Sequence, residues 1–152
     1  MLIHLLEPHH AEDFKRISLA WLDKYGLTEP GDLQEIEKIC QDWPAEYTLW
    51  GASVEGKLAG VIGLYQGESA NEVIKLGVDE AYQGKGIGRA LIQTLMDEVE
   101  RRGLEEVILY SNSQLVAALE AYRKFGFEEV PIDAAIAMKY HTADVKMRWR
   151  KK

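Results

Sequence analysis

Apolar residues recur at helical spacing in two stretches near the start of this chain. The first stretch, residues 11–25, places its apolar side chains three or four positions apart, at Phe14, Ile17, Trp21, Leu22 and Tyr25. The second, residues 33–42, does the same with Leu33, Ile36 and Ile39. Such spacing lines one face of an amphipathic helix. We therefore predict two helices, the first ended by Gly26 and the second capped by Asp32 and ended by Pro44.

Strand-like runs fill the middle and the end of the chain. Residues 47–54 and 58–65 are joined by Glu55-Gly56, which predicts a hairpin. The other strand-like runs are residues 2–6, 72–78, 107–110, 127–130 and 144–149. Helical spacing returns after residue 89, where Gly103 ends it, and again at residues 115–125. This order predicts an α/β sandwich around one mixed sheet, with residues 1–152 forming a single domain.

Composition narrows the classes of function. The chain has 152 residues, of which 47% are apolar and 28% charged, as expected of a folded protein. The formal net charge is −7, which argues against nucleic acid as the main partner because phosphate binding needs a basic surface. An acidic surface also favours cationic substrates, although solubility alone explains a negative charge.

A few local features bear on redox chemistry and location. Cys40 is the only cysteine, so no internal disulfide forms, and its apolar helical position predicts a small core residue rather than a nucleophile. The first residues lack a basic segment and include Pro8, which argues against a signal peptide. The longest apolar run, residues 58–65, is too short to cross a bilayer. We therefore expect a cytoplasmic protein without a membrane partner.

The most informative segment is a glycine-rich turn between the strand at 72–78 and the next helix. Its residues are Gln83, Gly84, Lys85, Gly86, Ile87, Gly88 and Arg89. Glycines let a backbone approach a ligand closely, and the N–H groups at a helix start form an anion site. Lys85 and Arg89 add two cations, so the turn predicts a cradle for a pyrophosphate.

Two common phosphate-binding motifs do not match this turn. A mononucleotide P-loop needs Lys-Ser or Lys-Thr after its last glycine, where this chain has Arg89-Ala90. A dinucleotide fingerprint needs Gly or Ala three positions after its second glycine, where Arg89 or Leu91 stands. The pattern that remains is Gln83-x-x-Gly86-x-Gly88.

This pattern resembles the acyl-CoA signature of the GNAT superfamily of N-acetyltransferases. A second segment, Tyr122-Arg-Lys-Phe-Gly-Phe127, is similar to the end of a helix in that family. The two motifs stand in the family's order, and with the strand order the resemblance covers nearly the whole chain. It implies the GNAT architecture, in which one mixed, mostly antiparallel sheet is flanked by helices. It also implies acetyl-CoA as cosubstrate, without a metal.

The resemblance implies which residues hold acetyl-CoA. The amides of residues 83–89 would bind the pyrophosphate, and Ala118 would contact the cosubstrate from the later helix. The strand before the turn would pair with the pantetheine arm through Leu76, Gly77 and Val78, although these also suit a plain interior strand. Many relatives carry an asparagine seven residues before the tyrosine, where this chain has Leu115. Asn112 stands ten residues before it, and either contacts the cosubstrate or caps the helix.

The resemblance also implies two catalytic residues. Tyr122 would protonate the departing CoA thiolate, although its helical face would also suit a core tyrosine. Glu72, eleven residues before Gln83, matches a glutamate that some relatives use as general base; the alternative is an exposed acid at a strand start. Other relatives place a glutamate after the glycine-rich helix, where this chain has Tyr110.

The acceptor pocket of this family lies around the first two helices and the last strands. The candidates there are Tyr25, Glu29, Asp32, Tyr47 and Trp50. Acids and aromatic rings together suit a cationic amine, but Tyr25 and Trp50 also suit the core. We expect an enzyme that acetylates the primary amine of a small molecule. Acetylation of a protein N-terminus or lysine and non-catalytic acyl-CoA sensing are the alternatives, a dinucleotide-binding domain is a distant one, and a homodimer stays open.

Overall fold

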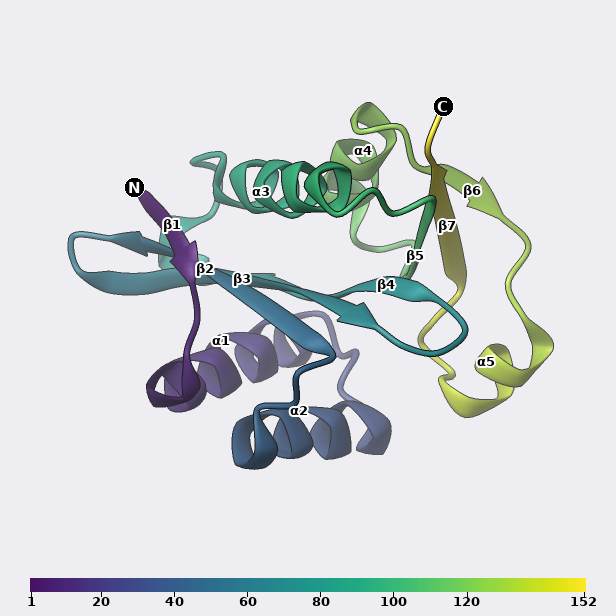
Figure 1. Ribbon diagram of the computed structural model, residues 1–152. Helices are drawn as coiled ribbons and strands as arrows, with labels where there is room; N and C mark the ends of the chain where they lie inside the picture. Colours follow the sequence, from purple (N-terminus) through teal and green to yellow (C-terminus); the bar gives the residue numbers. More distant parts are fainter.

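The computed structural model describes residues 1–152 and contains one seven-stranded sheet in the order β1-β2-β3-β4-β5-β7-β6 (Figure 1). The strands are β1 (Leu2–Leu5), β2 (Tyr47–Val54), β3 (Lys57–Gln66), β4 (Asn71–Val78), β5 (Glu106–Ser111), β6 (Glu128–Val130) and β7 (Val145–Arg150). Only β4 and β5 run parallel, and every other neighbouring pair is antiparallel. The expected mixed, mostly antiparallel sheet is therefore confirmed.

Helices cover both faces of this sheet. Figure 1 shows α1 (Ala11–Lys24) and α2 (Pro30–Asp42) on one face, and α3 (Ile87–Arg101) and α4 (Val116–Lys124) on the other. A fifth helix, α5 (Ala134–Lys139), lies in the β6–β7 connection and was not predicted. The short 3-10 turns η1 (Pro8–His10) and η2 (Glu80–Tyr82) complete the elements. None of the helices combines the length and apolarity that a membrane crossing requires.

The sheet separates two hydrophobic cores. The larger core has 20 buried residues and packs under α3 and α4, with Leu91, Leu95 and Val99 at its centre. The smaller core has 9 buried residues and includes Phe14, Ile36 and Ile39 from α1 and α2, as their helical spacing predicted. Cys40 packs against this smaller core as a half-buried side chain.

The start of α2 differs from the prediction. Asp32 does not occupy the N-cap; Glu29 does, and Pro30 is the first helical residue. The two acids form a reciprocal capping box, in which the Asp32 carboxylate accepts a hydrogen bond from the Glu29 amide at 3.1 Å. Proline suits this first position because its missing N–H would have no helical partner. The helix therefore begins three residues earlier than its apolar pattern indicates.

Candidate functional site

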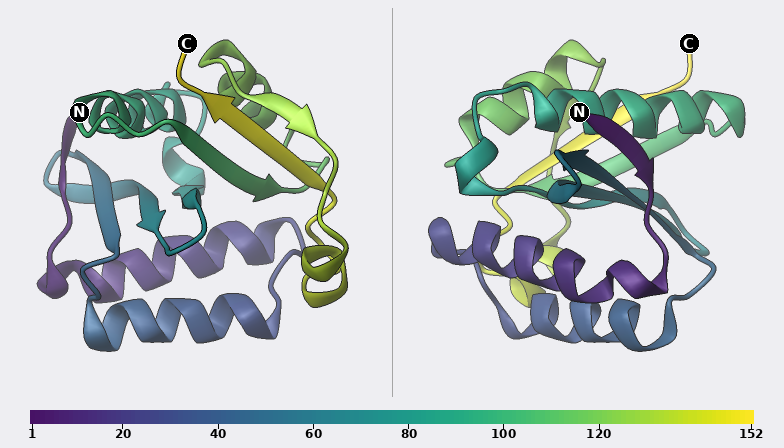
Figure 2. Two further views of the ribbon diagram at one scale, coloured as in Figure 1. Left: turned by 45° about the vertical axis from the view of Figure 1, so that its right-hand side comes forward. Right: turned by 90° about the vertical axis from the view of Figure 1, so that its left-hand side faces the viewer.

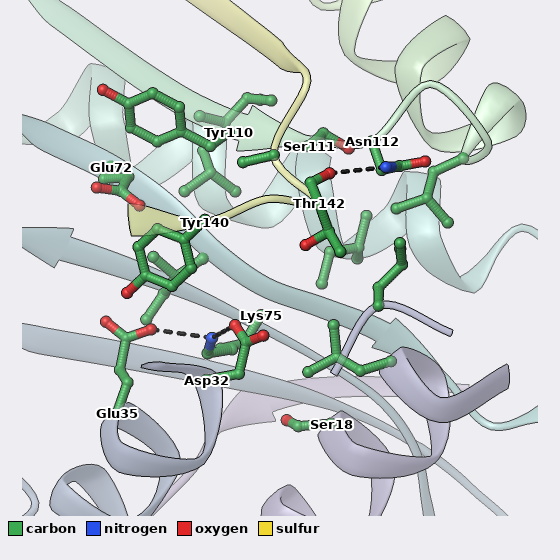
Figure 3. Close-up of a pocket in the computed structure, with 18 of the residues that line it drawn as sticks. Ser18, Asp32, Glu35, Glu72, Lys75, Tyr110, Ser111, Asn112, Tyr140 and Thr142 are labelled. Atoms are coloured by element: carbon green, nitrogen blue, oxygen red, sulfur yellow. Dashed lines mark hydrogen bonds and ion pairs between the residues drawn. The ribbon is translucent and has the colours of Figure 1, made fainter. Parts of the chain in front are cut away.

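A cavity opens where β4 and β5 part. The two strands pair only at Glu72 with Ile108 and at Val73 with Leu109. Beyond Val73, the edge of β4 that faces β5 has no strand partner. The gap between the two strands forms part of a cavity of about 350 Å³. Residues of α1, α2, β4, β5, α4 and the segment before β7 line the cavity (Figure 3). An unpaired strand edge inside a cavity can accept an extended ligand as an added strand.

The glycine-rich turn has the geometry of an anion cradle. Gly84 and Gly86 have φ angles of +79° and +78°, which favour glycine, and a Cβ at either would meet no atom within 4 Å. Gly86 caps the N-terminus of α3, so the first N–H groups of that helix have no carbonyl partner within it. The side of the turn on which these Cβ atoms would stand is therefore open to a ligand. The residues therefore suit a phosphate or pyrophosphate group.

A residue that sequence reasoning missed adds a third cation here. Lys24, at the end of α1, donates a hydrogen bond to the side-chain oxygen of Gln83 at 2.7 Å. The Gln83 amide nitrogen in turn donates to the Val78 carbonyl at 3.2 Å. Lys24 and the turn are far apart in sequence, so no local motif links them. The contact fixes the side chain of the first signature residue.

Gly77 has a packing reason to be glycine. A Cβ on Gly77 would stand 3.2 Å from the Cβ of Trp21 and 3.6 Å from Ile17. The missing side chain of Gly77 therefore makes room for α1. Leu76 lines the cavity beside it, whereas Gly77 and Val78 do not.

Tyr122 projects from α4 into the same cavity and is 5% exposed. Its ring packs edge-on against Phe127, with ring centroids 5.5 Å apart. Burial raises the pKa of the Tyr122 hydroxyl above its ordinary value. A phenol in this state keeps its proton at neutral pH. Both the core interpretation and the acid interpretation of Tyr122 thus describe part of its environment.

Glu72 lies on β4 in the short stretch that pairs with β5, one residue before the strands part. Burial, and then the negative charge of Glu35, raise the pKa of the Glu72 carboxyl to about 7. Lys75, Lys139 and Lys146 oppose this rise. Glu72 is therefore not the exposed acid that one interpretation predicted. A carboxylate with this pKa can take a proton near neutral pH.

A bulge in β4 brings a buried lysine into the cavity. Val61 of β3 faces Gly77 and Gly63 faces Ile74, so Ile62 alone is opposite two β4 residues, Lys75 and Leu76. Lys75 has a φ of +54°, in the left-handed region that side chains rarely adopt. Without the bulge, Lys75 would share the apolar α3 face with Val73. The bulge turns it toward α2 instead.

Lys75 binds two carboxylates of α2 (Figure 3). Its side chain is 10% exposed, and its ammonium lies 3.1 Å from Asp32 and 2.9 Å from Glu35. Burial alone would lower the pKa of Lys75, but the charges of Glu35 and Asp32 outweigh it and raise that pKa. Lys75 therefore stays protonated. Glu35 also accepts a hydrogen bond from the Tyr47 hydroxyl at 3.2 Å.

The predicted acceptor residues divide into two groups. Glu29, Asp32 and Tyr47 line the cavity. Tyr25 and Trp50 do not: Tyr25 stacks on Trp21 at the end of α1, and Trp50 is buried in the larger core across the sheet. Trp50 is therefore the core residue that the alternative interpretation predicted, whereas Tyr25 is half-buried outside the cavity.

The segment before β7 closes one end of the cavity. Glu29 accepts hydrogen bonds from the His141 amide and the Thr142 hydroxyl, both at 2.8 Å. Tyr140 packs on the start of α2 so closely that a Cβ on Gly31 would stand 2.6 Å from its ring. Figure 2 shows α5 beside the connection between α1 and α2. Lys139 and Tyr140 also line the cavity, and no sequence motif had indicated them.

Asn112 is engaged within the protein. Its side-chain nitrogen donates to the Thr142 carbonyl at 2.7 Å, and its oxygen accepts from the Gln114 amide at 2.9 Å. It does not cap α4, whose N-cap position is Leu115 with no side-chain cap. Both Asn112 and Ala118 line the cavity. No group of His, Cys, Asp and Glu side chains converges in an arrangement that could hold a metal ion.

Comparison with known sequences gives a family match. Residues 14–127 match the sequence model of the acetyltransferase (GNAT) family. The chain is 31% identical over 141 residues to a mycothiol acetyltransferase of Mycobacteroides abscessus, an alignment that covers 87% of this chain and 47% of that protein. The chain spans less than half the length of the mycothiol acetyltransferases that it matches.

Solved structures share the fold. A GNAT-family acetyltransferase of Staphylococcus aureus Mu50 superposes with a TM-score of 0.82 at 18% identity, over 99% of both chains. The PaiA N-acetyltransferase of Thermoplasma acidophilum, solved in complex with coenzyme A, superposes with a TM-score of 0.73 at 20% identity, over 99% of this chain and 100% of the other. At these identities the likeness concerns the fold.

Proposed function

Because the chain belongs to the GNAT family of acetyltransferases, we propose that it transfers the acetyl group of acetyl-CoA to a primary amine of a small molecule. The observation that carries this proposal is that Glu72 and Tyr122, from different elements, line one cavity at the gap between β4 and β5. A base and an acid are the two groups that amine acetylation needs.

The cosubstrate side of the proposal rests on the turn and the strand edge. The N–H groups of residues 83–89 would hold the pyrophosphate, with Lys85 and Arg89 adding positive charge. Lys24 would hold Gln83 in place from α1. The free edge of β4 at Leu76 would accept the pantetheine arm as an added strand, which directs the thioester toward Tyr122. Ala118 lines the cavity on the α4 side. The side-chain amide of Asn112 already forms hydrogen bonds within the protein through both its nitrogen and its oxygen.

The chemical step divides between the two titratable groups. Glu72, directly or through a water molecule, would take the proton that the acceptor amine must lose. The amine nitrogen then forms a bond to the thioester carbonyl carbon, and the carbon–sulfur bond breaks. Tyr122 would donate its proton to the departing sulfur, so that neutral CoA thiol leaves. A tyrosine hydroxyl holds its proton at neutral pH, so the proton is present when the sulfur becomes negative.

The acceptor end of the cavity favours a small molecule over a protein chain. Glu29 holds the segment before β7 against the start of α2, so we expect this end of the cavity to admit a small amine more readily than a folded polypeptide. Relatives named mycothiol acetyltransferase also favour a small acceptor. Acetylation of peptide amines but not of metabolites would support the protein-directed alternative instead.

The first test is calorimetric titration with acetyl-CoA, with NADH in parallel, followed by turnover with a panel of amines. We expect binding of acetyl-CoA alone. Tyr122→Phe should lower kcat about 100-fold or more, because it removes the acid and leaves the ring in place. Tyr25→Phe is the matched control, since Tyr25 lies outside the cavity, and it should turn over like the parent.

Two outcomes would contradict the proposal. If Tyr122→Phe keeps the parent's kcat, the assigned acid is wrong. Tight binding of acetyl-CoA without turnover of any amine would identify a sensing module instead.

A further inference from the structure

The acceptor end of the cavity carries more negative than positive charge. Four carboxylates line the cavity, those of Glu29, Asp32, Glu35 and Glu72. The two ammonium groups that line it are those of Lys75 and Lys139. Lys75 alone is shared between Asp32 and Glu35, so this cluster keeps a net negative charge. In a partly buried cavity such a charge is weakly screened and attracts a cation strongly.

Lys75 does not make the site suitable for an anion. Two of its three N–H groups already meet carboxylates, at 3.1 Å and 2.9 Å. A carboxylate or phosphate on an acceptor would have to approach the same ammonium beside Asp32 and Glu35, and like charges at such a distance repel. Lys75 therefore holds the carboxylates of Asp32 and Glu35 in position, and the region around them keeps a net negative charge.

A buried hydroxyl in the same cavity lacks a partner. Ser18 of α1 is 3% exposed, and its oxygen has no hydrogen-bond partner in the protein. Ser18 lines the cavity with Asp32, Glu35 and Lys75, as Figure 3 shows. Buried polar groups are nearly always hydrogen-bonded in native proteins. Because Ser18 lines the cavity, a polar group of a bound ligand would supply such a partner.

Tyrosine rings surround the acidic cluster. Tyr47 and Tyr65 stack with ring centroids 4.8 Å apart, and Tyr65 faces Glu72 across the β3–β4 pair. Tyr140 lines the cavity from the segment before β7. Aromatic faces stabilise ammonium groups, the more so where water is excluded. Acids and tyrosines thus line the acceptor end together.

We propose, on the premise of the acetyltransferase function above, that the acceptor is a diamine without a carboxylate: one amine reacts beside Glu72, while a second ammonium group binds at Glu35, Asp32 and the tyrosines. The second ammonium holds the acceptor in place, and the reacting amine loses its proton to Glu72. Ser18 accepts or donates a further hydrogen bond to the bound acceptor. The diamine is defined by this charge pattern, which linear polyamines and diamino sugars share.

A matched set of acceptors tests the charge pattern. The set is 1,4-diaminobutane, 1-aminobutane and 4-aminobutanoate, which share a four-carbon chain and end in an ammonium, a methyl and a carboxylate group. We expect kcat/KM for the diamine to exceed that for the monoamine about ten-fold or more, with the amino acid last. A diamino sugar in a parallel arm distinguishes a ring acceptor from a linear one.

Variants then test the residues. Glu35→Gln, assayed at about pH 8.5, should raise the KM for the diamine about ten-fold, leave kcat within about three-fold, and remove the preference over the monoamine. Glu37→Gln is the matched control on the same helix, because Glu37 pairs with Lys15 outside the cavity and is 46% exposed. Ser18→Ala is a second variant, which should keep the parent's melting temperature and weaken diamine binding about three-fold or more.

Calorimetric titration of each acceptor into the CoA complex reads binding without turnover. Diamine binding without acetylation would support the acceptor site and overturn the acetyltransferase function. Acetylation of 1-aminobutane or 4-aminobutanoate as efficiently as the diamine would overturn this inference and keep the function. An equal effect of Glu35→Gln on all three acceptors would also overturn it.

Discussion

At the scale of single residues, Glu72 shows how position sets chemistry. Glu72 is paired with Tyr65 on β3 and with Ile108 on β5, one residue before the last pair that β4 and β5 form. The charged groups that act on it come from α2, β4, α5 and β7, namely Glu35, Lys75, Lys139 and Lys146. Burial and Glu35 outweigh the three lysines, so the pKa of Glu72 rises to about 7. An ordinary glutamate would be ionised throughout the neutral range and would be a weaker base.

This pKa predicts a pH dependence. The base must be ionised, so kcat/KM of the parent should rise with pH through about 7. Glu72→Gln should lower kcat about 100-fold and lose this limb when assayed with the same acceptor. Comparing the two profiles removes the titration of the amine, which both share. A parent profile that is flat between about pH 5 and 9 would contradict the assignment.

The same group has an opposite effect on stability. Because the pKa of Glu72 is higher in the folded state than in the unfolded chain, the folded state binds the proton more tightly. Its contribution to the unfolding free energy is therefore fully present below about pH 4.5 and is lost as the pH rises through about 7. Glu72→Gln should thus melt above the parent at about pH 8 and near it at about pH 4.

At the scale of elements, the glycine-rich turn and α3 form one unit. Gly86 supplies a left-handed residue at the N-cap of α3, and Gly103 supplies another where that helix ends. Both have positive φ angles, of +78° and +67°, and at neither would a Cβ meet a neighbouring atom. The two glycines therefore adopt the same left-handed conformation at opposite ends of α3. Only Gly86 belongs to the glycine-rich turn.

This pair gives a matched prediction. Gly86→Ala and Gly103→Ala should each lower the unfolding free energy by about 1 kcal/mol, because L side chains disfavour left-handed angles. Only Gly86→Ala should also weaken acetyl-CoA binding, by about ten-fold or more, because it distorts the N–H groups of the cradle. Chemical denaturation and calorimetry measure the two effects. Equal acetyl-CoA affinity in both variants would place the pyrophosphate elsewhere.

At the scale of the whole molecule, the cavity that we propose binds the acceptor is assembled from distant parts of the chain. Glu29, in the connection between α1 and α2, bonds His141 and Thr142, which are more than a hundred residues later. Tyr110 and Lys146 bind Asp133 at the other end of the same segment. The segment that contains α5 is thus held at both ends against the cavity.

Weakening one of these attachments should affect acceptor binding and leave acetyl-CoA binding unchanged. Glu29→Gln keeps an oxygen for the α2 cap but loses the charge that strengthens the bonds to His141 and Thr142. We expect faster hydrogen exchange in residues 131–144 and a KM for the acceptor about three- to ten-fold higher. Acetyl-CoA affinity should not change, and Glu37→Gln on α2 should match the parent. A change in acetyl-CoA affinity without a change in the KM for the acceptor would contradict the assignment of this end of the cavity to the acceptor.

The sequence by itself determined most of the elements and the glycine-rich turn that we propose binds the cosubstrate. Hydrophobic spacing gave the helices and strands because periods of 3.6 and 2 are local properties. The glycine-rich turn could be predicted from the sequence because positive φ angles and free N–H groups depend on neighbouring residues alone. The helix α5 was missed because it has only six residues, none of them buried, so no apolar period marks it.

The tertiary structure decided which side chains meet. Lys75 enters the cavity because a bulge shifts the β3–β4 register, and a register belongs to a pair of strands. Lys24 reaches Gln83, and Glu29 reaches Thr142, through contacts 59 and 113 residues apart in sequence. Tyr47 and Trp50 stand on the same strand, yet Tyr47 lines the cavity and Trp50 lies in the larger core. Burial and neighbouring charge, which set the pKa of Glu72, exist only once distant segments have packed.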